Sequence, residues 1–242
     1  MPPAKPSDDE RIPDSRRPVV LMWSGGKDAA LAMEAIRAGG GHRVVGLLTT
    51  VVEEGETVTL HGTPLDLIRR QADALGLPIA VMPVPPAPSN ATYEARLERA
   101  LAPWQAEGVS TVAVGDVFLE DIRTYRQETF QVIAVDVLFP IWGEDTEVLA
   151  HRFWDRGFQA VVASVDTTQL NPSFAGRTYD PSFVDDLPDE ADPCGENGEF
   201  HTFVTHAPFF DDAIPVVVAE RHGDGRMRYA RLEEKAFPPS ST

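Results

Sequence analysis

The sequence predicts an α/β protein with an open, mostly parallel sheet and a small α+β subdomain at its C-terminal end. Between residues 18 and 165, short apolar runs alternate with longer segments of helical spacing, which is the rhythm of right-handed βαβ units. After about residue 166 a stretch rich in Pro, Asp, Ser and Gly leads into short strands separated by turns. The 242 residues suffice for one large domain with a smaller appendage.

The individual elements follow from local patterns. A strand buried on both faces of a parallel sheet needs apolar residues at every position, whereas a helix repeats them every three or four residues. Continuous apolar runs predict strands of the sheet at 18–23, 44–52, 79–84, 111–117, 135–142 and 160–165. Helical spacing predicts helices at 28–38, 64–75, 91–107, 121–133 and 146–156. Three shorter strands are predicted in the C-terminal part, at 200–204, 214–220 and 227–233.

These elements suggest three segments. Residues 1–17 carry several prolines among charges, so we predict a disordered tail. We assign residues 18–143 to the domain that contains the parallel sheet. Residues 144–242 are predicted to form a C-terminal subdomain that closes a cleft and binds substrate.

The composition limits the partners of the chain. With 21 Lys and Arg against 38 Asp and Glu, the net charge of −17 would repel duplex nucleic acid and anionic membranes. No apolar run approaches the roughly 20 residues of a membrane span, and residues 1–17 lack the apolar core of a secretory signal. Cys194 is the single cysteine, which excludes an internal disulfide or a Cys-x-x-Cys pair. We therefore expect a cytoplasmic protein, and a homodimer is among the states that the sequence allows.

A glycine turn joins the first predicted strand to the first helix. Helix N-termini bind phosphate through unpaired N–H groups, and glycines let the backbone approach closely. Ser24, Gly25, Gly26, Lys27 and Asp28 therefore predict a phosphate-binding turn, with Asp28 as a helix cap or a Mg²⁺ ligand. The spacing fits neither a Walker P-loop nor a dinucleotide-binding G-x-G-x-x-G.

This turn resembles the PP-loop of the N-type ATP pyrophosphatases. That resemblance implies the PP-loop fold and an enzyme that binds ATP and cleaves it to AMP and pyrophosphate. Ala29 stands where the family usually has a serine, so one hydroxyl contact to phosphate is missing. We also expect Thr49 and His61, which precedes Gly62, to contact the nucleotide.

Two further acidic clusters follow along the chain. Gly115 and Asp116 open the segment GDVFLED, which ends the fourth predicted strand. The carboxyl ends of parallel strands face the ligand crevice, so Asp116 is a candidate to bind metal together with Asp28. The second cluster, DPCGENGEFHT at 192–202, places Glu196, Glu199 and His201 around a turn. Carboxylates and a histidine in such a turn are candidates for proton transfer.

Together, the three segments resemble the diphthine–ammonia ligase family over roughly residues 18 to 210. The resemblance implies a ligase that activates a carboxylate with ATP and Mg²⁺, and converts the acyl-adenylate to an amide with ammonia. It implies Lys27, Asp28, Glu196, Glu199 and His201 as catalytic residues. In the best-known members the carboxylate is diphthine on a translation elongation factor. The variant ENGEFHT at 196–202 resembles a bacterial branch linked to corrinoid amide metabolism, so the acceptor is either protein-borne diphthine or a small carboxylate.

Two alternatives stay open. One is a nucleotide-binding regulatory module that senses ATP without catalysis, which the alanine at position 29 favours. The other is a PP-loop enzyme that thiolates tRNA or attaches lysine to it. The missing cysteine pairs and the acidic charge argue against a tRNA partner.

Overall fold

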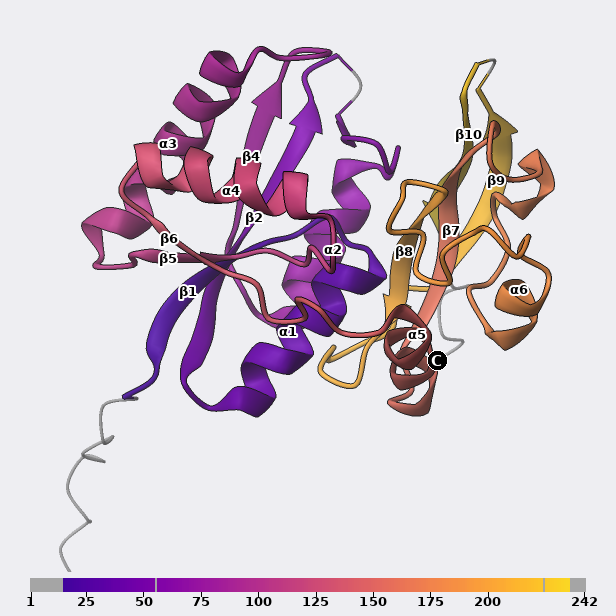
Figure 1. Cartoon of the computed structure of the whole chain (residues 1–242), viewed down its shortest axis with the longest axis horizontal. Coiled ribbons are helices and arrows are strands. Elements are labelled where there is room, and N and C mark those ends of the chain that lie inside the picture. Colours follow the sequence, from indigo (N-terminus) through magenta and orange to yellow (C-terminus); the bar gives the residue numbers. More distant parts are fainter. Residues whose placement is uncertain (1–14, 55, 224, 236–242) are drawn as a thin grey trace, which may run out of the picture.

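The computed structural model describes residues 15–54, 56–223 and 225–235 and has two β-sheets (Figure 1). Sheet A contains six strands: β1 (Arg17–Met22), β2 (His42–Val52), β3 (Thr57–Val58), β4 (Ile79–Val84), β5 (Thr111–Ala113) and β6 (Asp136–Leu138). Sheet B contains four strands: β7 (Gln159–Asp166), β8 (Phe200–His206), β9 (Val216–His222) and β10 (Met227–Glu234). The predicted α/β class with a separate C-terminal sheet is confirmed.

The order of sheet A creates a crevice at one edge. β1 lies at its centre and pairs in parallel with both β2 and β5. β4 continues the sheet beyond β2, and β6 continues it beyond β5, again in parallel. The short β3 pairs antiparallel with the end of β2. The chain therefore winds in opposite directions on the two sides of β1, and ligands of such sheets bind where the strands β1 and β5 end.

Helices cover both faces of sheet A. They are α1 (Lys27–Gly39), α2 (Leu65–Leu75), α3 (Asn90–Ala106) and α4 (Glu120–Val132), each close to its predicted bounds. The cluster formed by α3 and α4 packs on one face, against side chains such as Val20 and Val112. α1 and α2 pack on the other face, against Val19 and Leu21. Alternate residues of β1 thus serve two separate cores, as its pleat requires.

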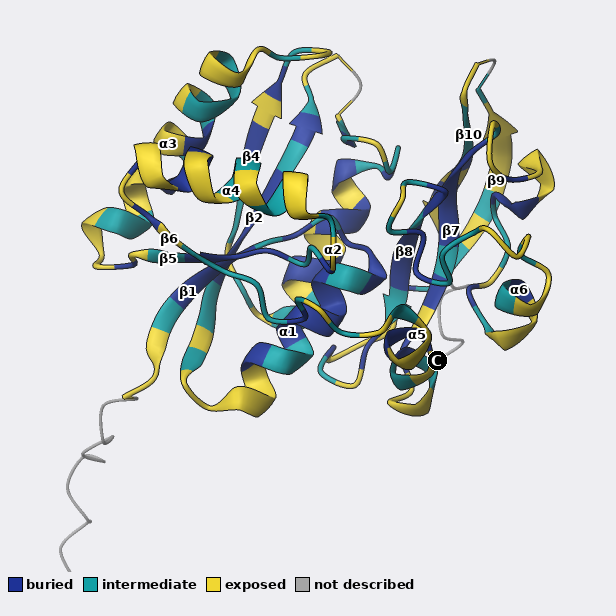
Figure 2. Cartoon of the chain, in the orientation of Figure 1, coloured by how far each residue is buried: buried dark blue, intermediate teal, exposed yellow. Residues whose placement is uncertain are grey.

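α1 and α2 also contact the C-terminal part, so they lie between the two sheets (Figures 1 and 2). That part begins with α5 (Thr146–Asp155) and includes the short η1 (Pro172–Phe174) and α6 (Pro181–Asp185). Buried residues of α1, β7 and β8 belong to one continuous cluster, for example Leu31, Val162 and Phe203. The N-terminal sheet and the C-terminal sheet consequently share a core.

The strand predicted at 160–165 belongs to sheet B, which differs from the expectation that it continues the parallel sheet. As β7 it pairs antiparallel with both β8 and β10. Its residues from Val162 to Asp166 are all buried, because this inner strand of sheet B is covered on both sides. A continuous apolar run indicates burial on both faces but does not identify the sheet.

The other differences concern the ends of elements. β5 and β6 are shorter than the predicted 111–117 and 135–142, because the chain leaves the ladder there to form loops. Of the predicted tail, residues 1–14 lie outside the described residues, and Arg17 already belongs to β1. None of the helices within the described ranges is long and apolar enough to cross a membrane.

Candidate functional site

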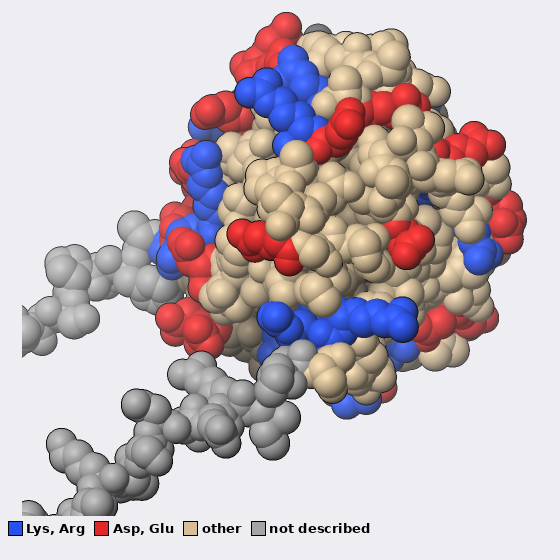
Figure 3. Space-filling view, turned by 90° about the vertical axis from the view of Figure 1, so that its left-hand side faces the viewer, with Lys and Arg blue, Asp and Glu red and all other residues tan. Residues whose placement is uncertain are grey.

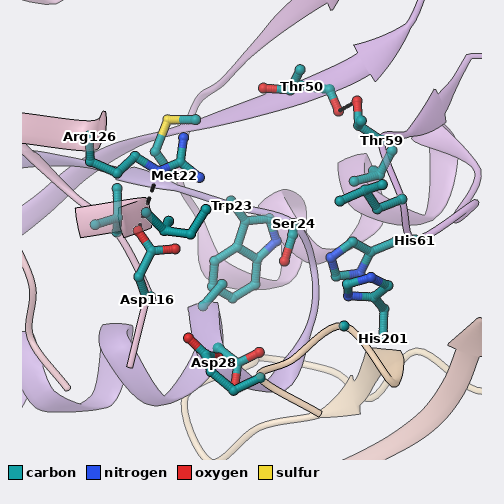
Figure 4. A pocket seen from close by; sticks show the side chains of 18 of the residues that line it. Met22, Trp23, Ser24, Asp28, Thr50, Thr59, His61, Asp116, Arg126 and His201 are labelled. Atoms are coloured by element: carbon teal, nitrogen blue, oxygen red, sulfur yellow. Dashed lines mark hydrogen bonds and ion pairs between the residues drawn. The ribbon is translucent and has the colours of Figure 1, made fainter. Parts of the chain in front are cut away.

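A cavity of about 440 Å³ opens where β1 and β5 end (Figure 4). It lies at the position expected from the strand order, and all three predicted segments reach it. The predicted residues that line it are Ser24, Asp28, His61, Gly115, Asp116, Glu196 and His201. Side chains separated by more than 170 positions in the sequence therefore meet in one place, whereas Gly25, Gly26, Lys27, Thr49 and Glu199 are not among its lining residues.

The glycine turn is held by packing within the protein. Gly25 has φ +81°, and a Cβ there would lie 2.5 Å from Ile68 Cδ1. At Gly26 a Cβ would lie 3.0 Å from the carbonyl oxygen of Thr202. The space that a Cβ would occupy at these two glycines is filled by α2, β8 and the His61 ring.

Gln71 of α2 fixes this turn, although the sequence did not lead us to predict it. Its side chain is completely buried. Its Nε2 donates hydrogen bonds to the carbonyls of Gly25 (3.0 Å) and Val204 (2.7 Å), and its Oε1 accepts one from the Trp23 indole (2.8 Å). The Gly25 carbonyl also accepts a bond from the Val204 amide at 2.8 Å. The sequence signal that could have identified Gln71 is its place on the apolar face of the predicted helix.

The first amides of α1 divide into two groups. The Gly26 N–H donates to Ser24 Oγ (3.3 Å), and the Lys27 N–H donates to Thr202 Oγ1 (3.0 Å). The N–H groups of Asp28 and Ala29 follow in the first turn, where a helix supplies no acceptor. Asp28 and Ala29 both line the cavity, so the positive end of the helix dipole lies at its wall.

Lys27 and Asp28 form an ion pair at the base of the cavity. Lys27 is only 2% exposed, and its Nζ lies 2.9 Å from Asp28 Oδ1 and donates to Oδ2 at 3.0 Å. Burial alone would lower the pKa of Lys27, but the charge and hydrogen bond of Asp28, together with Cys194 and Glu196, raise the pKa overall, so the ammonium stays charged. Burial raises the pKa of Asp28, and Lys27 opposes that rise. Lys27 is therefore a buried charge held in place by Asp28.

Asp116 pairs with a cation that was not among the residues predicted from the sequence. Arg126 of α4 donates from Nε to Asp116 Oδ2 (3.3 Å) and from Nη1 to the Tyr93 hydroxyl of α3 (3.3 Å). All three side chains line the cavity. Figure 4 shows Asp116 and Arg126 on one side of Trp23 and Ser24, with His61 and His201 on the other.

The two glutamates of the third segment occupy different environments. Glu196 lines the cavity and accepts a hydrogen bond from the Val117 amide (2.9 Å). Burial, together with the nearby Asp28, raises the pKa of Glu196 to about 7. Glu199 is 1% exposed, and its Oε1 accepts bonds from the Asp192 amide (2.9 Å) and the Asn197 side chain (3.2 Å). Glu199 thus stabilises the loop, and its side chain does not line the cavity.

His61 and His201 stack at the cavity wall, with ring centroids 4.6 Å apart. His61 Nδ1 lies 3.3 Å from the Thr202 carbonyl, which can only accept, so Nδ1 carries the proton. Burial lowers the pKa of His61 to about 4, and burial with the proximity of His61 lowers the pKa of His201 well below its ordinary value. Both rings are therefore neutral at pH 7, which makes His201 a weak proton acceptor.

Two family models match the chain. Residues 17–133 match the model of the diphthamide synthase N-terminal domain, and residues 145–236 match that of the diphthamide synthase C-terminal domain. The chain belongs to the diphthamide synthase family. No curated protein matches it. The predicted resemblance to the diphthine–ammonia ligases is thereby confirmed.

One expected contact of this diphthamide synthase family member falls on the wrong side of its strand. Thr49 is 1% exposed and its hydroxyl has no hydrogen-bond partner within the described structure, whereas Leu48 and Thr50 line the cavity. Successive side chains of a strand point to opposite faces, so a shift of one position exchanges core and cavity.

The carboxylates of the cavity are oxygen ligands of the kind that Mg²⁺ prefers. Asp28 Oδ1 is buried and accepts no well-aligned hydrogen bond among the described residues. Across those same residues, no group of three or more His, Cys, Asp or Glu side chains is arranged to hold a metal ion. Mg²⁺ commonly takes one or two carboxylates and completes its shell with phosphates and water, so Asp28 and Asp116 remain suitable ligands for a nucleotide-bound ion.

Proposed function

We propose that this diphthamide synthase family member is an ATP-dependent ligase that adenylates a substrate carboxylate and then converts it to an amide with ammonia. The observation that carries the proposal is the convergence of the three family segments on one cavity at the ends of β1 and β5. A volume of about 440 Å³ lies within the usual range of small-molecule sites, roughly 300–1,000 Å³.

The first step forms an acyl-adenylate. A carboxylate oxygen of the substrate attacks the α-phosphorus of ATP, and pyrophosphate leaves with the electron pair of the broken P–O bond. Asp28 and Ala29 line the cavity at the first turn of α1, and the buried ammonium of Lys27 is paired with Asp28. Fixed dipoles and charges of this kind stabilise a transition state without reorganising.

Mg²⁺ is expected to bind with the nucleotide through Asp28 and Asp116. When bound, it would offset part of the phosphate charge. The cavity needs such help, because its own carboxylates, Asp28, Asp116 and Glu196, repel an anionic ligand.

The second step releases AMP. The nitrogen lone pair of ammonia attacks the acyl carbon, and AMP leaves with the electrons of the C–O bond. The nitrogen must then lose a proton, and Glu196 is the side chain suited to accept it, because its pKa of about 7 gives a substantial carboxylate fraction at neutral pH. The neutral stack of His61 and His201 would instead hold the reactants in place.

ATP–pyrophosphate exchange, screened over protein-borne diphthine and small carboxylates including corrinoid acids, tests the first step. We expect exchange that depends on one acid, with AMP and pyrophosphate as products. Release of ADP with orthophosphate would contradict the proposal. ATP binding without any exchange would instead support the regulatory alternative.

A pair of variants tests the second step. Glu196→Gln keeps a hydrogen-bond acceptor for the Val117 amide but removes the proton acceptor. We expect pyrophosphate exchange to persist, while amide formation falls by about 10²-fold or more. Glu190→Gln, at an exposed position two residues before this segment, is the matched control and should leave both rates unchanged. Equal rates of amide formation in the two variants would exclude Glu196 as the base.

A further inference from the structure

Arg126 stands out in the charge distribution of the cavity. Within the described part of the chain, it is the single Lys or Arg side chain that lines the cavity. The other charged lining residues are carboxylates, namely Asp28, Asp116 and Glu196. The two lining histidines are neutral at pH 7, because burial lowers their pKa values. A ligand with several negative charges therefore meets one fixed positive side chain on the cavity wall.

The guanidinium of Arg126 is held in place by two other elements. Its Nε donates to Asp116 Oδ2, which follows β5, and its Nη1 donates to the Tyr93 hydroxyl of α3, both at 3.3 Å. An arginine guanidinium is not deprotonated in proteins, so the group stays charged. These contacts fix the orientation of the planar group before any ligand arrives.

Arg126 keeps donors that the protein does not use. A guanidinium has five N–H groups, and two of them are bonded to Asp116 and Tyr93. For the other three, including both on Nη2, the described structure shows no acceptor. The side chain is 25% exposed and borders the cavity, so a ligand can reach these donors. The Tyr93 hydroxyl accepts from Arg126, which leaves its own proton available to the same ligand.

The arrangement is not explained by stability alone. A partly exposed ion pair contributes only about 0–1 kcal/mol to folding. The Arg126 guanidinium instead presents the planar fork that binds carboxylate and phosphate oxygens through two parallel hydrogen bonds. The pair thus has the features of a prepared binding group.

We propose that Arg126, positioned by Asp116 and assisted by the Tyr93 hydroxyl, forms an oxyanion subsite that binds a carboxylate or phosphate group of the ligand. This inference rests on the proposed function, which supplies two candidate sources of the oxyanion. One is the phosphates of ATP, and the other is the carboxylate of the acceptor. Both sources offer the same chemistry to a guanidinium. An experiment with separate arms for nucleotide and acid distinguishes them.

Three variants of the full-length chain provide the test. Arg126→Met removes the charge and keeps the apolar stem, whereas Arg126→Lys keeps a cation beside Asp116 without the fork. Arg123→Met is the matched control, since Arg123 lies one turn earlier on α4, stacks over Trp142 at 4.5 Å and does not line the cavity. Thermal unfolding of each variant establishes that it is folded. If Arg126→Met does not fold, Arg126→Lys replaces it in the test.

The nucleotide arm measures the dissociation constants of ATP and adenosine. If Arg126 binds a phosphate, Arg126→Met weakens ATP binding by about tenfold or more and leaves adenosine binding unchanged. The acid arm measures pyrophosphate exchange with the carboxylate found in the screen. If Arg126 binds the carboxylate, the ATP constant is unchanged and the KM of the acid rises by about tenfold or more. In either case we expect Arg126→Lys to lose most of the binding that Arg126→Met loses, because lysine lacks the fork.

The inference is overturned if Arg126→Met matches Arg123→Met in both arms, or if adenosine binding falls as much as ATP binding. Failure of the proposed function is a separate result. A wild-type chain that binds ATP but exchanges no pyrophosphate with any acid contradicts the ligase proposal. The nucleotide arm then decides alone, and an unchanged ATP constant in Arg126→Met overturns the subsite.

Discussion

Glu196 illustrates how one side chain can acquire its chemistry from its surroundings. The loop before β8 directs its carboxyl toward the cavity, where the Val117 amide donates to Oε1 and Asp28 lies near. Burial makes the ionised form costly, which raises the pKa from 4.5 to about 7. The same shift has a consequence for folding.

Stability should decrease as this carboxyl ionises. Between pH 4.5 and about 7 the folded chain holds a proton on Glu196 that the unfolded chain has lost, so the free energy of unfolding falls as pH rises through this window. Glu196→Gln lacks this titration. We expect the free energy of unfolding of the variant, relative to that of the wild type, to rise by about 2–3 kcal/mol from pH 4.5 to 7.5, as measured in denaturant titrations. A difference that does not vary with pH would show that the carboxyl has an ordinary pKa.

At this scale the sequence identified the chemistry better than the direction of each side chain. Ser24, Asp28, Asp116 and Glu196 were predicted for the site and line the cavity. Arg126 was not predicted, because an arginine on a polar helix looks like a solvated one until α3 and β5 are placed beside it. Distances between elements, which no local pattern encodes, decided these cases.

At the scale of elements, the glycine turn depends on its neighbours α2 and β8. The Gly25 carbonyl accepts from the Gln71 side chain and from the Val204 amide, and the Lys27 amide donates to Thr202. The sequence predicted the strand, the turn and the helix, because each has a local signature. It could not predict that the two glycines face protein, since the segments that cover them lie about 45 and 175 residues away along the chain.

Gln71→Met tests this support. The change keeps the volume but removes the Gln71 donor from the Val204 carbonyl and the acceptor from the Trp23 indole, and it leaves the Gly25 carbonyl with the Val204 amide alone. A buried polar group left unsatisfied costs about 1–3 kcal/mol. We expect a loss of roughly 2–4 kcal/mol in the free energy of unfolding, together with weaker ATP binding. Gln105→Met is the matched control, since Gln105 Nε2 donates to the Ile133 carbonyl away from the turn. Equal ATP affinities in the two variants would contradict a positioning function for Gln71.

At the scale of the whole molecule, the segment around His61 adds a second link between the two sheets beside the cavity. Leu60 has φ +66° and its carbonyl accepts from the Ser164 hydroxyl of β7 (3.0 Å), while His61 stacks on His201 of β8. Gly62, at φ +67°, packs directly against the Tyr229 ring of β10. Three strands of sheet B thus contact one segment that connects β3 to α2.

On the face drawn in Figure 3, Lys and Arg side chains form small groups bordered by Asp and Glu, so the strongly acidic chain still has local charge balance.

Gly62→Ala should disturb this contact between the sheets. An added Cβ collides with the Tyr229 ring, in addition to the strain of a positive φ, which costs about 1 kcal/mol. Gly76→Ala separates the two effects, because Gly76 has φ +63° and a Cβ added there would meet no atom within 4 Å. We expect Gly62→Ala to lower the melting temperature clearly more than Gly76→Ala, and to weaken ATP binding, which Gly76→Ala should not. Identical melting curves would show that Tyr229 simply moves aside.

The path of the backbone between the sheets has a practical consequence. All strands of sheet A precede residue 139 and all strands of sheet B follow residue 158, so the polypeptide passes from one to the other once. A protease cut between them would leave two fragments, each with an uninterrupted hydrogen-bonding ladder. Neither fragment alone would carry all the residues that line the cavity, and we expect the complete cavity to form when the two fragments are mixed.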